Sequence, residues 1–110
     1  MSPTRAPAVA GFFYPADRAE LESALASYLG AVAAPHGSAP PPKALIVPHA
    51  GYVYSGPVAA SGYARIAAQR RAIRRVVVLG PSHRIPLHGL AASSADAEVT
   101  VASTMPSRRR

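Results

Sequence analysis

Apolar residues recur at helical spacing in the first third of the chain. They are Leu21, Leu25, Tyr28 and Val32. This spacing places them on one face of a helix. Asp17 offers a carboxylate to the free amides of a first turn, and Glu20 stands where it can bond back to the Asp17 amide, as in a capping box. The pattern predicts a helix that begins after Asp17 and ends near Gly30.

Short apolar runs further along the chain are typical of strands. Lys43 to Val47 (KALIV) and Arg74 to Leu79 (RRVVVL) are too short for buried helices. The three valines of the second run have stiff side chains that favour a pleated sheet. Gly89 to Ser93 is a weaker third candidate. The sequence therefore predicts two strands and a possible third.

A second helix is predicted between the first two strands. It covers Pro57 to Ala72, with Ser55 or Gly56 as its cap and the proline in its first turn. The order strand, helix, strand over residues 43–80 has about the length of one right-handed crossover unit, whose strands are parallel. We therefore predict an α/β fold class: an incomplete open parallel sheet with flanking helices.

Composition narrows the class of protein. The 110 residues include no cysteine, which excludes a disulfide scaffold and a thiolate nucleophile. No stretch reaches the roughly 18 apolar residues of a membrane span, and prolines interrupt the start where a signal peptide is apolar. We expect a cytoplasmic protein with no membrane partner.

The net positive charge of the chain does not indicate a particular binding partner. Twelve Lys and Arg against five Asp and Glu give a net charge of +7. Much of it lies in arginines at 70–75 and 108–110. The first group ends the second predicted helix, where the helix dipole favours cations. No aromatic residues interleave with these arginines, so nucleic acid is not the expected partner.

Two histidines occupy equivalent positions relative to the predicted strands. His49 follows residues 43–47 directly, and His83 follows residues 74–80. Ligands of open parallel sheets bind beyond the carboxyl ends of the strands, so both imidazoles are expected at one crevice. Two histidines with one carboxylate form the usual non-haem ferrous site. Spacing alone leaves open whether they bind metal or backbone, whereas His36 and His88 are interpreted as surface residues.

The residues around this crevice do not fit a phosphate-binding loop or a serine hydrolase. Pro57 and Val58 stand where a phosphate-binding loop needs Lys and Ser or Thr, and Val53 stands where a serine-hydrolase elbow needs glycine. Both motifs are rejected. A non-catalytic alternative remains: amides at the start of the second helix, with Arg84, would bind a phosphorylated or acidic partner. Tyr52 is interpreted as covering the sheet.

Three runs in this order resemble the start of the Memo family, whose bacterial members are usually called AmmeMemoRadiSam system protein B. They are residues 5–15 (RAPAVAGFFYP), 48–56 (PHAGYVYSG) and 79–83 (LGPSH). The resemblance implies a fold similar to that of class III extradiol dioxygenases. It also implies that His49 and His83 are metal ligands and that Tyr54 lies near the metal as a catalytic candidate.

The same resemblance implies a cofactor and partners. The cofactor is a divalent transition metal, with iron as the first expectation and copper or zinc as alternatives. If the protein is an enzyme, it is expected to be a non-haem, metal-dependent, dioxygenase-like oxidoreductase. The ligand is a small molecule or an acidic group of unknown identity. The family name implies a functional association with AMMECR-like and radical SAM proteins.

The chain also departs from the family pattern. Members of the family are considerably longer, and their C-terminal part supplies the third metal ligand, which is absent from this chain. We therefore predict a partial Memo-like α/β domain over residues 1–95. Residues 96–110 match nothing in the family pattern and are predicted to be a disordered tail. These features predict a fragment or a truncated member of the family.

Overall fold

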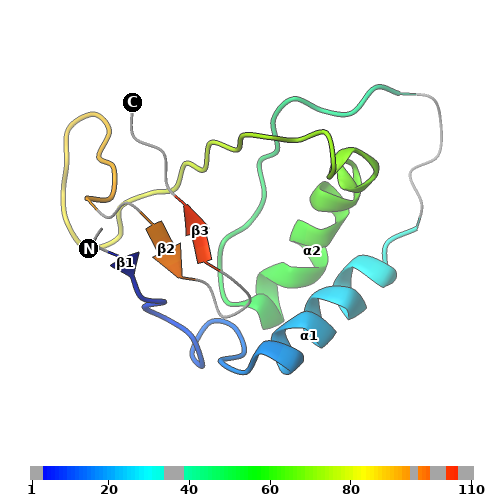
Figure 1. Cartoon of the computed structure of the whole chain (residues 1–110), viewed down its shortest axis with the longest axis horizontal. Helices are drawn as coiled ribbons and strands as arrows, with labels where there is room; N and C mark the ends of the chain where they lie inside the picture. Colours follow the sequence, from blue (N-terminus) through cyan, green and yellow to red (C-terminus); the bar gives the residue numbers. More distant parts are fainter. Residues whose placement is uncertain (1–3, 34–38, 95–96, 100–103, 107–110) are drawn as a thin grey trace.

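The computed structural model describes residues 4–33, 39–94, 97–99 and 104–106. Two helices lie side by side, and a small sheet lies beyond them (Figure 1). The helical elements are α1 (Arg18–Gly30), α2 (Tyr52–Ala64) and a short 3-10 helix, η1 (Ala67–Gln69). The strands are β1 (Thr4–Arg5), β2 (Ala97–Val99) and β3 (Thr104–Pro106). The described part of the chain is thus a small, mixed, helix-rich fragment.

The sheet joins the two ends of the described chain. β1 pairs in parallel with β2, with Thr4 opposite Ala97, and β2 pairs antiparallel with β3, with Glu98 opposite Met105. Both β2 and β3 lie within residues 96–110, the predicted tail. The division into residues 1–95 and 96–110 stays a prediction.

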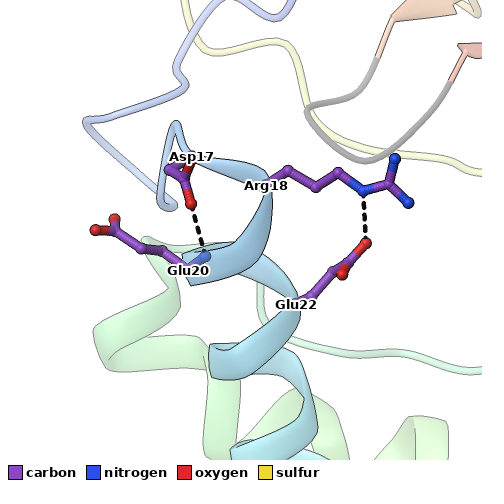
Figure 2. A network of polar contacts seen from close by, with 4 residues as sticks. All are labelled: Asp17, Arg18, Glu20 and Glu22. Carbon is purple, nitrogen blue, oxygen red and sulfur yellow. Dashed lines mark hydrogen bonds and ion pairs between the residues drawn. The ribbon is translucent and has the colours of Figure 1, made fainter.

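Helix α1 begins where the sequence predicts. The Asp17 carboxylate accepts a hydrogen bond from the Glu20 amide at 3.0 Å, so Asp17 is the N-cap. Figure 2 shows this bond, with the Glu20 carboxylate directed away from Asp17. Arg18 instead forms an exposed ion pair with Glu22, with Nε and Oε1 2.8 Å apart. Of the predicted stripe, Leu21 is buried and Leu25 is exposed.

Helix α2 begins five residues before the predicted start. Gly51 is its N-cap, and the Tyr52 amide donates to the Phe13 carbonyl at 2.8 Å. This contact with a distant part of the chain anchors the first turn. Pro57 therefore lies inside the helix, where its missing amide removes one backbone hydrogen bond. The prediction that Pro57 opens the helix was wrong, because it considered local residues only.

Helix α2 ends earlier than predicted. The helix ends at Ala64, and the chain continues through turns and η1 instead of reaching residue 72 as one helix. Both α1 and α2 have 13 residues. At about 1.5 Å per residue, 13 residues extend roughly 20 Å. No helix in the described ranges is long and apolar enough to cross a membrane.

Two glycines on α2 allow close packing on different sides of the helix. A Cβ added at Gly56 would lie 2.6 Å from the Tyr28 ring of α1. A Cβ added at Gly62 would lie 2.8 Å from the Val47 side chain. The absence of side chains at these positions brings α1 and the segment before α2 against the same helix. We refer to α1 and α2 together as the helix pair.

The predicted strands do not form. Residues 43–47, 74–79 and 89–93 are described, yet none of them is in a strand. Ile46 is fully exposed, and residues 76–79 are 70–85% exposed. Parallel strands need neighbours for their ladders and cover on both faces, and the described residues supply neither. We refer to residues 43–47 and 74–79 as the strand-prone segments. The α/β class stays a prediction.

The buried core is small for a chain of this length. Its buried residues include Leu21, Ala60 and Ser55. The Cα radius of gyration is 15.4 Å, whereas a compact domain of this length has a radius of roughly 13 Å. The buried residues therefore lie in the helix pair, while Val53 and Val58 of α2 and much apolar surface elsewhere face solvent.

Candidate metal site

The structure brings His49 and His83 together although 34 residues separate them in the sequence. Their Nε2 atoms lie 3.2 Å apart, and both side chains are exposed. The ring centroids are 5.3 Å apart, with 41° between the ring planes. The two Nε2 atoms are within hydrogen-bonding distance of each other, and which of them donates depends on the tautomers of the rings. The pair forms without a strand before either histidine.

The loop that carries His49 is anchored from α2. Ser55 lies in the first turns of this helix and is buried. Its hydroxyl donates to the Ala50 carbonyl at 2.7 Å and lies 3.3 Å from the Gly51 carbonyl. The Tyr52 amide also ties the start of the helix to the Phe13 carbonyl. The backbone beside His49 is therefore fixed on both sides of Gly51.

The segment that carries His83 is held by a smaller set of contacts. The Ser82 hydroxyl donates to the Ile85 carbonyl, which closes a turn around His83. This hydrogen bond is exposed, as are the residues of the turn. Each histidine thus has a serine that bonds a nearby backbone carbonyl. Only the serine on the His49 side is buried.

The donor pair has a separation suited to one metal ion. A cation at 2.0–2.1 Å from two nitrogens 3.2 Å apart would subtend an angle of about 100° between them. This angle lies between octahedral and tetrahedral values. Imidazole nitrogens suit iron, copper and zinc. Two histidines leave the set incomplete, and no cluster of three or more His, Cys, Asp or Glu forms within the described residues.

The other predicted residues contribute less to this site. Tyr54 is 83% exposed on α2, and its hydroxyl makes no hydrogen bond within the described part of the chain. His88 and Arg84 are exposed. His36 lies outside the described residues.

Tyr52 has a different environment from Tyr54. Its ring packs against Tyr14, with centroids 5.5 Å apart. Burial raises the pKa of the Tyr52 hydroxyl above its usual value, and the neighbouring Tyr14 and Tyr63 raise it further. The phenol therefore stays neutral at physiological pH and packs against the N-terminal segment.

The start of α2 has few amides left for an anionic ligand. The Tyr52 amide bonds to Phe13, and the amides of Tyr54 and Ser55 both bond to the Gly51 carbonyl. The alternative hypothesis of an acidic partner needs these same amides. Because these amides already bond to backbone carbonyls, the structure does not favour binding of an acidic partner there.

Sequence reasoning missed the role of Ser55. The sequence presents this residue only as a candidate cap of the second helix. A serine in a helix can donate to the carbonyl four residues earlier, which here is the more distant Gly51 carbonyl. That tendency does not indicate the Ala50 carbonyl, five residues earlier. The contribution of the Phe13 carbonyl had no such signal, because it is a backbone group far away in the sequence.

Comparisons with known proteins identify the family. The family model described as "Memo-like protein" matches residues 5–101. A MEMO1 family protein of Ignicoccus hospitalis is 49% identical over 86 residues, which cover 72% of this chain and 30% of that protein. The mouse "Protein MEMO1" is 39% identical over 87 residues, which cover 79% of this chain and 28% of that protein. The chain belongs to the Memo-like family.

The comparisons also limit what this membership implies. A MEMO1 family protein of Methanocaldococcus jannaschii is 42% identical over 90 residues, which cover 76% of this chain and 31% of that protein. The chain thus spans about 30% of the length of these relatives. No solved structure matches it. The names of the relatives give no biochemical activity.

Proposed function

We propose that this chain carries the two-histidine half of a divalent transition-metal site in a Memo-family protein. The supporting observation is the 3.2 Å separation of the Nε2 atoms of His49 and His83. Two nitrogens on separate loops converge on one point that is open to solvent. Exposure leaves room on the metal for a further protein ligand and for a substrate.

The proposed metal is iron first, with copper or zinc as alternatives. A divalent cation held there would act as a Lewis acid toward an oxygen-containing ligand. His49 and His83 would hold the cation, and Tyr54 would offer a hydroxyl from the neighbouring turn of α2. Dioxygenase-like chemistry is the finer proposal and rests on similarity of fold, which does not by itself establish a reaction.

The relatives contain a long portion that lies outside the region matched by this chain. The relatives are more than three times as long as the matched region. We propose that such a portion supplies the third ligand and the neighbouring strands. With those neighbours, the strand-prone segments would pair in the open parallel sheet of an α/β fold. The exposed residues 76–79 support this proposal, because central parallel strands are apolar on both faces.

Thermal unfolding with added metal tests the two-histidine site. A metal that binds only the folded form raises the midpoint of unfolding by mass action. We expect ferrous, zinc or cupric ions to raise the midpoint of the unsubstituted protein. His49→Ala and His83→Ala should each abolish the rise. His88→Ala is the matched control, since it removes an exposed histidine five residues from His83, and it should leave the rise unchanged.

Two results would contradict the proposal. One is that no metal shifts the midpoint of the unsubstituted protein. The other is that His88→Ala lowers the shift as much as His49→Ala does, which would indicate scattered binding to surface histidines.

A further inference from the structure

Ser55 is a buried polar side chain whose hydrogen bonds all lead to the His49 loop. It is 5% exposed, although it belongs to a helix whose neighbouring Tyr54 is 83% exposed. Its hydroxyl lies 2.7 Å from the Ala50 carbonyl and 3.3 Å from the Gly51 carbonyl. Burial of a hydroxyl is unfavourable unless the group is hydrogen-bonded, so these contacts account for its position.

The hydroxyl proton is directed mainly to Ala50. A serine has one proton to donate, and the Ala50 carbonyl is the nearer acceptor. The Gly51 carbonyl already accepts the amides of Tyr54 and Ser55. The bond to Ala50 thus adds a restraint that the helix backbone does not provide. It acts on the residue that directly follows His49.

His49 needs such a restraint because burial does not hold its ring. The side chain is exposed, and its described ring contact is with His83. A pair of ligands binds metal well only when the surrounding structure holds both in place before the metal arrives. Groups that orient metal ligands typically change metal affinity by about 10- to 100-fold when they are removed.

We propose that Ser55 is a positioning residue that holds the 49–51 loop so that the Nε2 of His49 meets that of His83. The relevance of this role to metal binding rests on the proposed function. The approach of the two rings is a geometric feature of the chain that can be followed without adding metal. The two can therefore be measured separately.

Nitrogen NMR of the metal-free protein tests the positioning directly. In the unsubstituted chain, long-range proton–nitrogen spectra should show one protonated Nε2 and one accepting Nε2 in the His49–His83 pair. Ser55→Ala should lose this inequivalence, and Ser55→Thr should retain it because the hydroxyl remains. Ser61→Ala is the matched control: it removes an exposed hydroxyl of the same helix, bonded to the Val58 carbonyl at 2.6 Å, and it should change nothing.

Titration with zinc alone gives the second readout. Ser55→Ala should weaken zinc binding by about 10-fold, while Ser55→Thr and Ser61→Ala should match the unsubstituted protein. The proposal is overturned if Ser55→Ala keeps both the imidazole signals and the zinc affinity. It is also overturned if Ser55→Thr loses the signals together with Ser55→Ala, since packing rather than the hydroxyl would then matter.

The two proposals fail in different ways. If the unsubstituted protein shows the paired imidazoles but binds no zinc, the metal proposal fails. The role of Ser55 is then decided by the imidazole signals alone. If the unsubstituted protein shows no paired imidazoles, the positioning role fails, whatever its zinc affinity.

Discussion

The helix pair and the strand-prone segments are both rich in apolar residues, yet the buried residues lie in the helix pair. Leu21 of α1 and Ala60 of α2 are buried, whereas residues 76–79 face solvent. A helix satisfies its backbone hydrogen bonds within itself, and it needs only one covered face. A central parallel strand needs two neighbours and two covered faces. In this region, which matches about 30% of its relatives' length, the helices therefore form and the strand-prone segments do not pair.

The largest expected difference between the two regions is the effect of truncating an apolar side chain. Leu21→Ala should lower the free energy of unfolding by about 2–3 kcal/mol, because it leaves a cavity in the small core. Val78→Ala should change it by less than about 0.5 kcal/mol, since that side chain is already exposed. Urea unfolding followed by circular dichroism measures both. Equal effects would show that the strand-prone segments are packed after all.

A smaller difference is expected between two glycines of α2. Gly56→Ala should lower the free energy of unfolding by about 1–3 kcal/mol, because the added methyl meets the packed Tyr28 ring. Gly62→Ala meets one atom of Val47 at 2.8 Å. Val47 is only half-buried and belongs to a strand-prone segment, so we expect this segment to move away with its backbone. The gain in helix propensity, about 1 kcal/mol, should then offset much of its cost.

The same urea experiment decides this comparison. Gly30→Ala is the control, because a methyl there meets nothing within 4 Å. A larger loss for Gly62→Ala than for Gly56→Ala would mean that residues 43–47 are held more firmly than α1.

The smallest expected effects concern the start of α1, within the helix pair (Figure 2). Asp17→Ala should cost about 1 kcal/mol of unfolding free energy, because the Glu20 amide loses its acceptor. Glu22→Ala removes the exposed ion pair with Arg18 and should cost at most about 0.5 kcal/mol. Added salt should weaken the second effect. The reverse order of the two costs would contradict the assignment of Asp17 as the cap.

The range of the interactions determines which elements the sequence predicts correctly. The bounds of α1 depend on Asp17 and Gly30, which are within or beside the helix, and the prediction was close. The start of α2 depends on the Phe13 carbonyl, about 40 residues away, and the local signal at Pro57 was misleading. The strands depend on partners that the described chain does not contain, so their apolar pattern did not produce strands.

The candidate metal site also depends on contacts that the sequence does not reveal. The sequence indicated His49 and His83 through their positions after apolar runs, and the structure places their nitrogens 3.2 Å apart. The strands on which this expectation was based do not form. What holds the pair is a hydroxyl-to-carbonyl bond from Ser55 and a turn closed by Ser82. Such side chain–backbone bonds leave no distinct pattern in a single sequence.

The most direct test of the account is a double-mutant cycle on zinc affinity. It compares the unsubstituted protein with His49→Ala, His83→Ala and the double variant by isothermal titration. If both imidazoles hold one ion, each single variant should lose nearly as much affinity as the double variant, so the losses should be strongly non-additive. Losses that simply add, or a single variant that binds zinc as well as the unsubstituted protein, would contradict a shared metal site.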